Sequence, residues 1–199
     1  MGLKKWSRVA FSDESKFGRI DSSAKSLVRR RKGERFAPYA TVPSVQGGGG
    51  SVTVWGVITY NGVGPLVFLE GTLNGCKYTH LLANNFVPFY ENTLRIDTIF
   101  QQDNASCHRS REVLKFMETE MPNVLDWPAQ SPDLNIIENF WHCIKQQLRN
   151  RNSANLTELR QNIENIWYNN PVSYIRKLFD SMPARIKAVK HSRGYPTKY

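Results

Sequence analysis

The chain has 199 residues, of which 40% are apolar and 12% aromatic, and 27 basic against 17 acidic residues give a net charge of +10. This length fits one domain with a full hydrophobic core and is short for two, and the apolar content excludes a disordered chain, so we expect a single domain over residues 1–199. No apolar run approaches the roughly 20 residues that cross a bilayer, and no apolar secretory segment opens the sequence, which argues against a membrane partner.

The net charge indicates the class of binding partner, and the cysteine content indicates the cellular compartment. Excess basic side chains favour a polyanion, and nucleic acid is the leading class, although many proteins are basic without binding it. Cys76, Cys107 and Cys143 are odd in number and widely spaced. That pattern fits neither a disulfide framework nor a zinc site with paired ligands, and it indicates a reducing, intracellular setting.

The first predicted strand leads into a pair of acids. Residues 6–11 alternate apolar side chains, Val9 and Phe11 among them, and run directly into Asp13 and Glu14. We therefore expect an acid at the end of this strand. Because successive side chains of a strand point to opposite faces, only one of the two acids enters a common site, and we choose Asp13.

The rest of the first half predicts short strands around a long loop. The segment 33–51 is rich in Pro and Gly and is expected to be a loop, with a linker-like glycine run at 47–51. Asn61-Gly62 is a turn signal between two strand-like runs, which predicts a hairpin. The expected strands in this half are 17–20, 26–30, 52–60 and 65–69.

A second acid follows a predicted strand in the middle of the chain. Apolar residues at helical spacing predict a helix over 77–94, with a kink at Pro88. A short strand is expected at 98–102, directly before Asp103, and a helix at 110–120 follows it. Asp13 and Asp103 are therefore both expected at strand ends.

The third acid lies on a predicted helix. A short strand at 123–127 and an irregular segment containing two prolines precede a helix over 134–150. At 100° per residue Glu138 lies beside the apolar stripe of this helix, so we expect a partly buried carboxylate. The remainder is expected to be helical, with starts signalled by Asn155 with Glu158, by Asn170-Pro171, and by Ser181-Met182-Pro183, before a loose tail at 194–199.

Three acids that converge can cut and join phosphodiesters. The chemistry needs an activated oxygen nucleophile, a stabilised leaving oxygen and neutralised phosphate charge, and two divalent cations about 4 Å apart provide all three. Mg²⁺ prefers carboxylate oxygens and keeps several waters, so Asp13, Asp103 and Glu138 would suffice. For three arbitrary acids the ordinary alternative is that the two aspartates are turn residues and Glu138 is a solvated helix acid.

The motifs around the acids decide between these alternatives. FSDESKF, QQDNASCH and SPDLNIIENFW resemble the three acid-bearing motifs of the Tc/mariner superfamily of DDE transposases, in the same order. Between Asp103 and Glu138 lie 34 residues, the spacing of the Tc-like branch, whose third acid is Glu where mariner proper has Asp. The resemblance runs from about Trp6 to Tyr199 and includes GGGGSVTVWG and WPAQSPDLN.

This resemblance implies an α/β, RNase H-like (retroviral integrase-like) fold, a mixed central sheet flanked by helices with extra C-terminal helices. It implies that Asp13 bridges two Mg²⁺ ions, replaceable by Mn²⁺, while Asp103 and Glu138 each hold one. It also implies a nuclear cut-and-paste enzyme that cuts double-stranded transposon ends and joins their 3′-hydroxyls to target DNA at TA sites, with a possible homodimer in the synaptic complex. Full-length relatives carry two helix-turn-helix subdomains that precede the catalytic domain, so we expect a truncated transposase with weak or non-specific DNA affinity.

Neighbouring residues have weaker signals. Asn104 and His108 could orient a metal-bound water or contact phosphate, or simply make loop hydrogen bonds. Asp133 is expected to cap the helix that bears Glu138 rather than bind metal, and Cys107 and Cys143 are expected to be small buried residues. The basic run consists of Arg29, Arg30, Arg31 and Lys32, for which phosphate contact is favoured over a solvated strand edge, with nuclear targeting as a further possibility. The loop 33–51 resembles, by position, a clamp that reaches a partner subunit or DNA.

Two rival functions remain. Another RNase H-like nuclease or a retroviral-type integrase would share the acids, but WPAQSPDLN and the 34-residue gap argue against it. A domesticated transposase kept as a DNA-binding protein without catalysis would share the whole resemblance. Intact acids argue against such decay without demonstrating turnover.

Overall fold

The computed structural model describes residues 3–19, 49–121, 123–128, 131–149, 151, 153–192 and 197. The predicted strand at 26–30, the basic run Arg29 to Lys32 and nearly all of the loop 33–51 lie outside the described residues. The elements below therefore refer to the described part of the chain.

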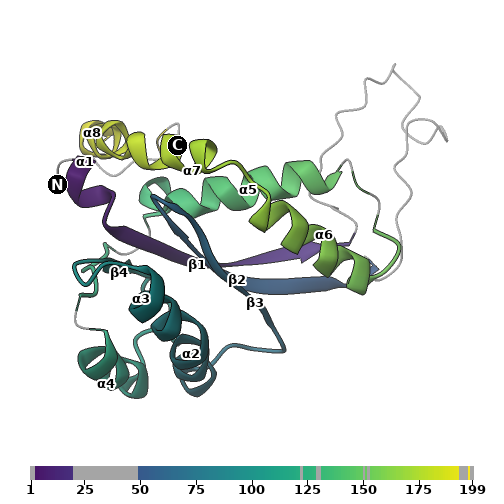
Figure 1. Ribbon diagram of the computed structural model, residues 1–199, viewed down its shortest axis with the longest axis horizontal. Coiled ribbons are helices and arrows are strands. Elements are labelled where there is room, and N and C mark those ends of the chain that lie inside the picture. Colours follow the sequence, from purple (N-terminus) through teal and green to yellow (C-terminus); the bar gives the residue numbers. More distant parts are fainter. Residues whose placement is uncertain are drawn as a thin grey trace.

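A mixed four-stranded sheet is the centre of the fold (Figure 1). Its strands are β1 (Val9–Gly18), β2 (Ser51–Thr59), β3 (Gly62–Leu69) and β4 (Ile99–Gln101), in the order β3-β2-β1-β4. The β2–β3 hairpin is antiparallel, as the Asn61-Gly62 turn predicts, and Gly62 has a φ of +138° that an L side chain rarely adopts. β1 is antiparallel to β2 and parallel to β4.

Two strand predictions were wrong in extent. The segment 17–20 is not a separate strand, because β1 runs unbroken to Gly18 and pairs with β2 from Phe11 to Gly18. Asp13 consequently lies in the middle of a strand and not at its end. The segment 123–127 makes only an isolated parallel bridge, from Val124 to Phe100, because its partner β4 is three residues long and offers no longer ladder.

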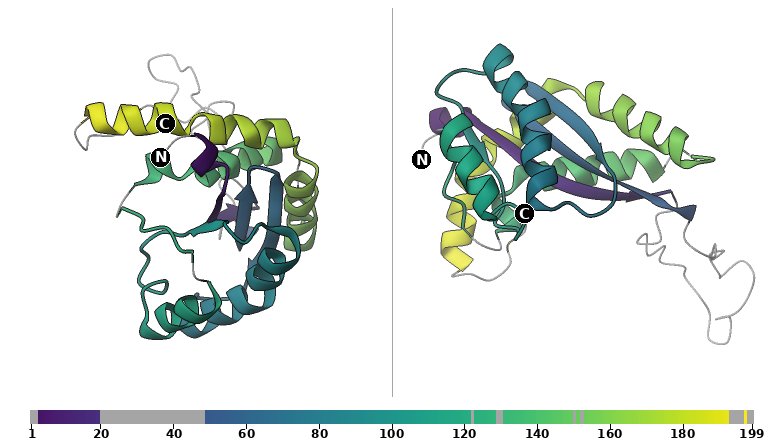
Figure 2. Two further views of the ribbon diagram at one scale, coloured as in Figure 1. Left: turned by 60° about the vertical axis from the view of Figure 1, so that its left-hand side comes forward. Right: turned by 90° about the horizontal axis from the view of Figure 1, so that it is seen from below.

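Helices cover both faces of the sheet (Figures 1 and 2). One face packs against α5 (Ile136–Arg149), α6 (Leu156–Tyr168), α7 (Val172–Asp180) and α8 (Met182–Ser192), with the short α1 (Leu3–Trp6) beside α7 and α8. The other face packs against α2 (Gly75–Leu81), a π-helical turn (Leu82–Phe86), α3 (Val87–Thr93) and α4 (Arg111–Glu120). The predicted helix 77–94 is thus one helical run whose irregularity is the π turn just before Pro88.

Alternation along β1 divides the core into two clusters. Phe11 and Phe17 pack with Trp141 on the α5 side, whereas Ala10 packs with Tyr78 on the α2 side. Odd-numbered residues of this strand therefore face α5 and even-numbered residues face α2 and α4. Of the two adjacent acids on this strand, Asp13 therefore faces α5 and Glu14 faces the opposite side.

Three helices, α6, α7 and α8, begin where the sequence signals predicted. The Asn155 side chain accepts a hydrogen bond from the Glu158 N–H at 2.9 Å and begins α6, and Ser110 caps α4 in the same way. Pro171 precedes α7, and α8 begins at Met182. None of the described helices combines the length and the apolar character that a bilayer crossing requires.

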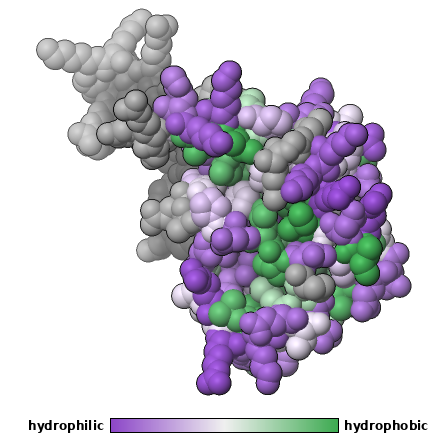
Figure 3. Space-filling view, turned by 90° about the vertical axis from the view of Figure 1, so that its left-hand side faces the viewer, coloured by the Kyte–Doolittle hydropathy of each residue, from purple (hydrophilic) through white to green (hydrophobic). Residues whose placement is uncertain are grey.

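The described surface is largely hydrophilic. On the face shown in Figure 3 apolar side chains form a narrow band bordered by hydrophilic ones. Large apolar side chains that are exposed anywhere on the described residues are Ile96, Leu114, Val124, Leu156, Tyr168 and Val172. Ile96 is the most exposed of them, at 87%.

Candidate active site

Asp13 lies on β1 and faces α5. The Trp141 indole Nε1 donates a hydrogen bond to its Oδ2 at 3.1 Å. Burial is the largest cause that raises the pKa of Asp13 to about 8, and the charges of Glu14, Glu138 and Asp103 raise it further. A carboxyl group in this setting stays protonated at neutral pH unless a cation compensates its charge.

Asp103 follows β4 by two residues, and the parallel pairing of Phe11 with Gln101 brings it level with Asp13 along the neighbouring strand β1. Its Oδ1 accepts a hydrogen bond from the Ala105 N–H at 2.9 Å and lies 2.7 Å from His108 Nδ1. The hydrogen bond with His108 is the main cause that lowers the pKa of Asp103, against a partial desolvation that raises it. Asp103 is therefore ionised at neutral pH.

Glu138 lies in the first turn of α5, on the side of the sheet that Asp13 faces. Its side chain is more exposed than the expected partly buried carboxylate. Partial desolvation, and then the charges of Asp103 and Asp133, raise the pKa of Glu138, while Lys145 lowers it. The repulsion from Asp103 indicates that these two acids face a common region.

The three acids thus come together from β1, the segment after β4, and α5. Asp103 raises the pKa of both other acids and Glu138 raises that of Asp13, so the cluster has mutual repulsion that a divalent cation would relieve. Among the described residues no three His, Cys, Asp or Glu side chains are gathered around one metal position. A two-ion site needs only pairs that share Asp13, because water and phosphate oxygens complete the coordination of hard cations. The donor set fits such a site.

His108 contacts two acids, Asp103 and Glu14. It is buried, with Nδ1 2.7 Å from Asp103 Oδ1 and Nε2 3.3 Å from Glu14 Oε1, and its ring packs on Tyr78 at 4.1 Å between centroids. Burial lowers the pKa of His108, but the contacts with Asp103 and Glu14 outweigh it and raise that pKa to about 10. Glu14 therefore faces away from Asp13, as the strand alternation predicts, and pairs with a charged imidazole.

Asn104 and Asp133 are two further residues for which the sequence predicted a role near the acids. The Asn104 Nδ2 donates to the Trp127 carbonyl at 2.7 Å, which is the loop hydrogen bond that the second interpretation of this residue expected. The prediction that Asp133 caps α5 was wrong. A 3-10 turn (Pro132–Leu134) contains Asp133, whose Oδ2 accepts from the Thr197 N–H at 2.9 Å. Cys107 and Cys143 were expected to be buried and are half-buried, and Cys76 is exposed.

Sequence reasoning missed Trp141 as a polar contact. Its place in the apolar stripe of α5 predicted only packing, and the helix does bury it to 3% exposure. A tryptophan has one N–H that needs a partner when buried. Because Trp141 lies three residues after the proposed catalytic acid Glu138, this requirement could have indicated a polar contact near the site.

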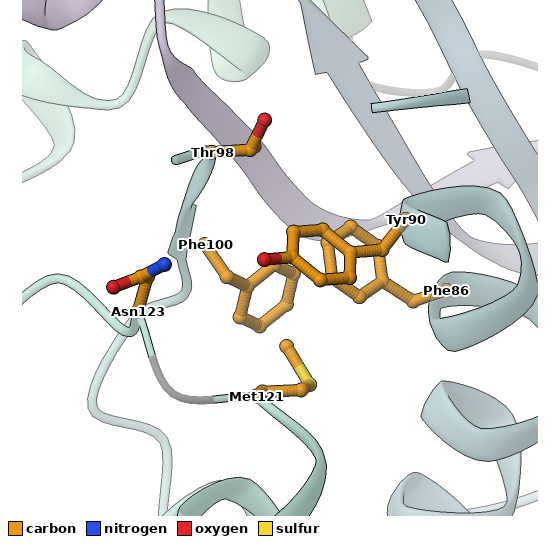
Figure 4. A pocket seen from close by; sticks show the side chains of 6 residues that line it. All are labelled: Phe86, Tyr90, Thr98, Phe100, Met121 and Asn123. Atoms are coloured by element: carbon orange, nitrogen blue, oxygen red, sulfur yellow. The ribbon is translucent and has the colours of Figure 1, made fainter. Parts of the chain in front are cut away.

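Two hollows lie apart from the acids. The smaller one lies between α3 and β4 and is lined by Phe86, Tyr90, Thr98, Phe100, Met121 and Asn123 (Figure 4). The larger one lies between β3 and α2 and includes Lys77 and His80. Neither includes Asp13, Asp103 or Glu138.

Comparison with known proteins gives consistent matches. The profile of the DDE superfamily endonucleases matches residues 8–160. The chain is 37% identical over 198 residues to the Tcb1 transposase of Caenorhabditis briggsae and 38% identical over 198 residues to the Tc1 transposase of Caenorhabditis elegans, in each case covering 100% of this chain and 72% of the relative.

Solved structures share the fold. The Mos1 mariner paired-end complex with Mn matches with a TM-score of 0.80 at 18% identity, over 97% of this chain and 57% of the Mos1 chain. The catalytic domain of Mos1 mariner transposase matches with a TM-score of 0.73 at 18% identity, over 97% of this chain and 85% of that domain. These matches confirm the RNase H-like fold.

Proposed function

This chain belongs to the DDE superfamily endonucleases and, within them, to the Tc-like transposases of the Tc/mariner superfamily, and on that premise we propose that Asp13, Asp103 and Glu138 are its catalytic acids. Family membership makes the chain a transposase catalytic domain and an enzyme. The observation that supports the assignment is that these acids, at the three motif positions on β1, after β4 and on α5, lie close enough for their charges to raise the pKa of Asp13 and of Glu138.

Each acid has its own role in the proposed two-ion mechanism. Asp13 would hold both ions, while Asp103 and Glu138 would hold one each. Two Mg²⁺ ions, or Mn²⁺ in their place, supply charge neutralisation at the phosphate and a lowered pKa for the attacking water or 3′-hydroxyl. Because burial and neighbouring charges raise the pKa of Asp13 to about 8, this carboxyl gives up a proton when it becomes a ligand. The attacking oxygen would release its proton to solvent and bond to phosphorus as the bond to the leaving 3′-oxygen breaks, and the leaving oxygen would take up a proton from solvent.

The proposed substrate is double-stranded DNA, at transposon ends and at TA target sites. The net charge of +10 supports a polyanionic substrate. Mos1, which shares the fold, has been solved as a paired-end complex and as a strand transfer complex. By analogy we infer a homodimer in the synaptic complex, and a nuclear location follows from a chromosomal substrate.

Metal-dependent nicking and strand transfer on a pre-cut end test this function. The wild-type chain is compared with D103A and E138A, and with E118A, which removes an exposed acid of α4 as a matched control. We expect activity with Mg²⁺ or Mn²⁺ from the wild type and E118A, and a loss of at least about 1000-fold in D103A and E138A. Equal activity in all four chains, or DNA binding without any metal-dependent cleavage, contradicts the proposal and favours a domesticated DNA-binding protein.

A further inference from the structure

Trp141 donates a hydrogen bond to the acid that is proposed to hold both metal ions. It lies on α5 three residues after Glu138, and its Nε1 is 3.1 Å from Asp13 Oδ2. An indole N–H is only a donor, so Trp141 cannot bind a cation itself. One helix thus presents a proposed metal ligand and a donor to a second ligand.

Two aromatic rings pack against the indole ring of Trp141. It stacks on Trp167, with 4.8 Å between centroids and 23° between planes, and Phe17 packs edge-on at 5.9 Å. The Trp167 Nε1 donates to the Gly64 carbonyl at 3.0 Å, which anchors the second ring to β3. The direction of the Trp141 N–H is therefore fixed by packing.

Gly56 makes room for these two rings directly opposite Asp13. It is the partner of Asp13 in the β1–β2 register. A Cβ at this position would lie 2.8 Å from Cη2 of Trp141 and 2.6 Å from Cη2 of Trp167, closer than real Cβ atoms approach. The absent side chain lets the tryptophans lie across β2 and reach the carboxylate.

We propose that Trp141 is a positioning residue that fixes the orientation of the Asp13 carboxylate for metal binding. A carboxylate has about four lone-pair sites, so the indole occupies one on Oδ2 and leaves the others for cations. Without this donor, Asp13 is free to turn away from the neighbouring charges of Glu14 and Glu138. This role rests on the proposed function, because it concerns the same metal site.

Direct measurement of Mn²⁺ binding by electron paramagnetic resonance, without DNA, tests the role. W141F keeps an aromatic ring and loses the N–H. W6F makes the same change at a buried tryptophan whose Nε1 has no hydrogen-bond partner among the described residues. We expect W141F to bind Mn²⁺ about 10-fold or more weakly than the wild type, and W6F to match the wild type. Equal affinity in W141F and W6F overturns the inference while leaving the proposed function intact.

A measurement on the wild-type chain avoids dependence on the folding of W141F. The five tryptophans give five indole ¹⁵N–¹H resonances. Trp→Phe variants assign them: each variant that folds lacks the resonance of the replaced tryptophan, and a resonance that remains is assigned by elimination. Saturating Mg²⁺ should shift the Trp141 resonance more than those of Trp6 and Trp55. A Trp141 resonance that stays in place while Mg²⁺ binds overturns the inference. A wild-type chain that binds neither ion overturns the proposed function itself.

Discussion

Asp13 has the most strongly altered ionisation among the proposed catalytic acids. Its pKa of about 8 in the folded, metal-free chain compares with 3.8 for an ordinary aspartate, because burial and then the charges of Glu14 and Glu138 disfavour the anion. Between these two pH values the folded state binds more protons than the unfolded state. The stability of the metal-free protein therefore falls as pH rises from about 4 to about 8.

The substitution D13N removes this loss of stability. The Asn amide oxygen still accepts from the Trp141 N–H. At one pKa unit per 1.36 kcal/mol, we expect D13N to raise the free energy of unfolding at pH 7 by roughly 2 to 4 kcal/mol, and by little at pH 4. Urea unfolding in a chelating buffer at several pH values measures the difference. Stability profiles that stay parallel for the two chains contradict the altered pKa of Asp13.

The buried imidazole of His108 is in contact with both Asp103 and Glu14. Its imidazole contacts Asp103 at 2.7 Å and Glu14 at 3.3 Å, and only a doubly protonated ring or a similar two-ended donor satisfies both. We expect H108Q to lower the nicking rate about 10- to 100-fold, since a glutamine amide reaches one acid but not both.

H108Q also changes the dependence of stability on pH. Burial lowers the pKa of His108, but its contacts with Asp103 and Glu14 raise that pKa to about 10. The stability that these contacts contribute is therefore complete below pH 6.5 and is lost as pH rises toward 10. H108Q should remove that loss, which unfolding curves between pH 6 and 10 will detect. Wild-type nicking rates together with an unchanged pH profile in H108Q contradict this role.

At the level of elements, the packing of α5 and α6 on the sheet depends on Gly56. We expect G56A to lower the free energy of unfolding by about 1 to 3 kcal/mol, because the added methyl group overlaps two stacked indole rings. Thermal or urea unfolding measures the change, with T53A on the same strand as the control. A G56A chain as stable as T53A shows that the rings can shift at no cost.

The sequence predicted the elements with local signals and missed those that depend on distant partners. The hairpin at Asn61-Gly62 and the cap at Asn155 were predicted, because turn and capping preferences lie within a few residues. The full length of β1 was not, since pairing with β2 extends it past Asp13. Asp133 was misassigned because the 3-10 turn and the contact with Thr197 arise only in the folded chain.

The candidate site was predictable in the same uneven way. The motifs and their spacing led to the proposal of the three acids, and the opposite directions of Asp13 and Glu14 follow from strand alternation. The contact from Trp141 was not predicted, because an apolar stripe does not show where a single indole N–H points. Packing geometry, not residue type, determines that contact.

At the scale of the whole molecule, the charge of +10 predicts a salt-dependent association with DNA. We expect the affinity for a duplex to fall by at least about 10-fold between 50 and 200 mM salt, as phosphate contacts release counterions. Fluorescence anisotropy with a labelled duplex measures this dependence, and a short acidic peptide is a suitable control ligand. An affinity that does not change with salt contradicts an electrostatic DNA interface.

We propose above that acids distant in the sequence share two metal ions at the junction of β1, β4 and α5. Anomalous diffraction from crystals soaked in Mn²⁺ tests it most directly. The account predicts two peaks about 3.5 to 4 Å apart, both beside Asp13, with Asp103 next to one and Glu138 next to the other. Peaks elsewhere on the protein, or well-ordered acids that bind no Mn²⁺ at saturating concentration, would contradict it.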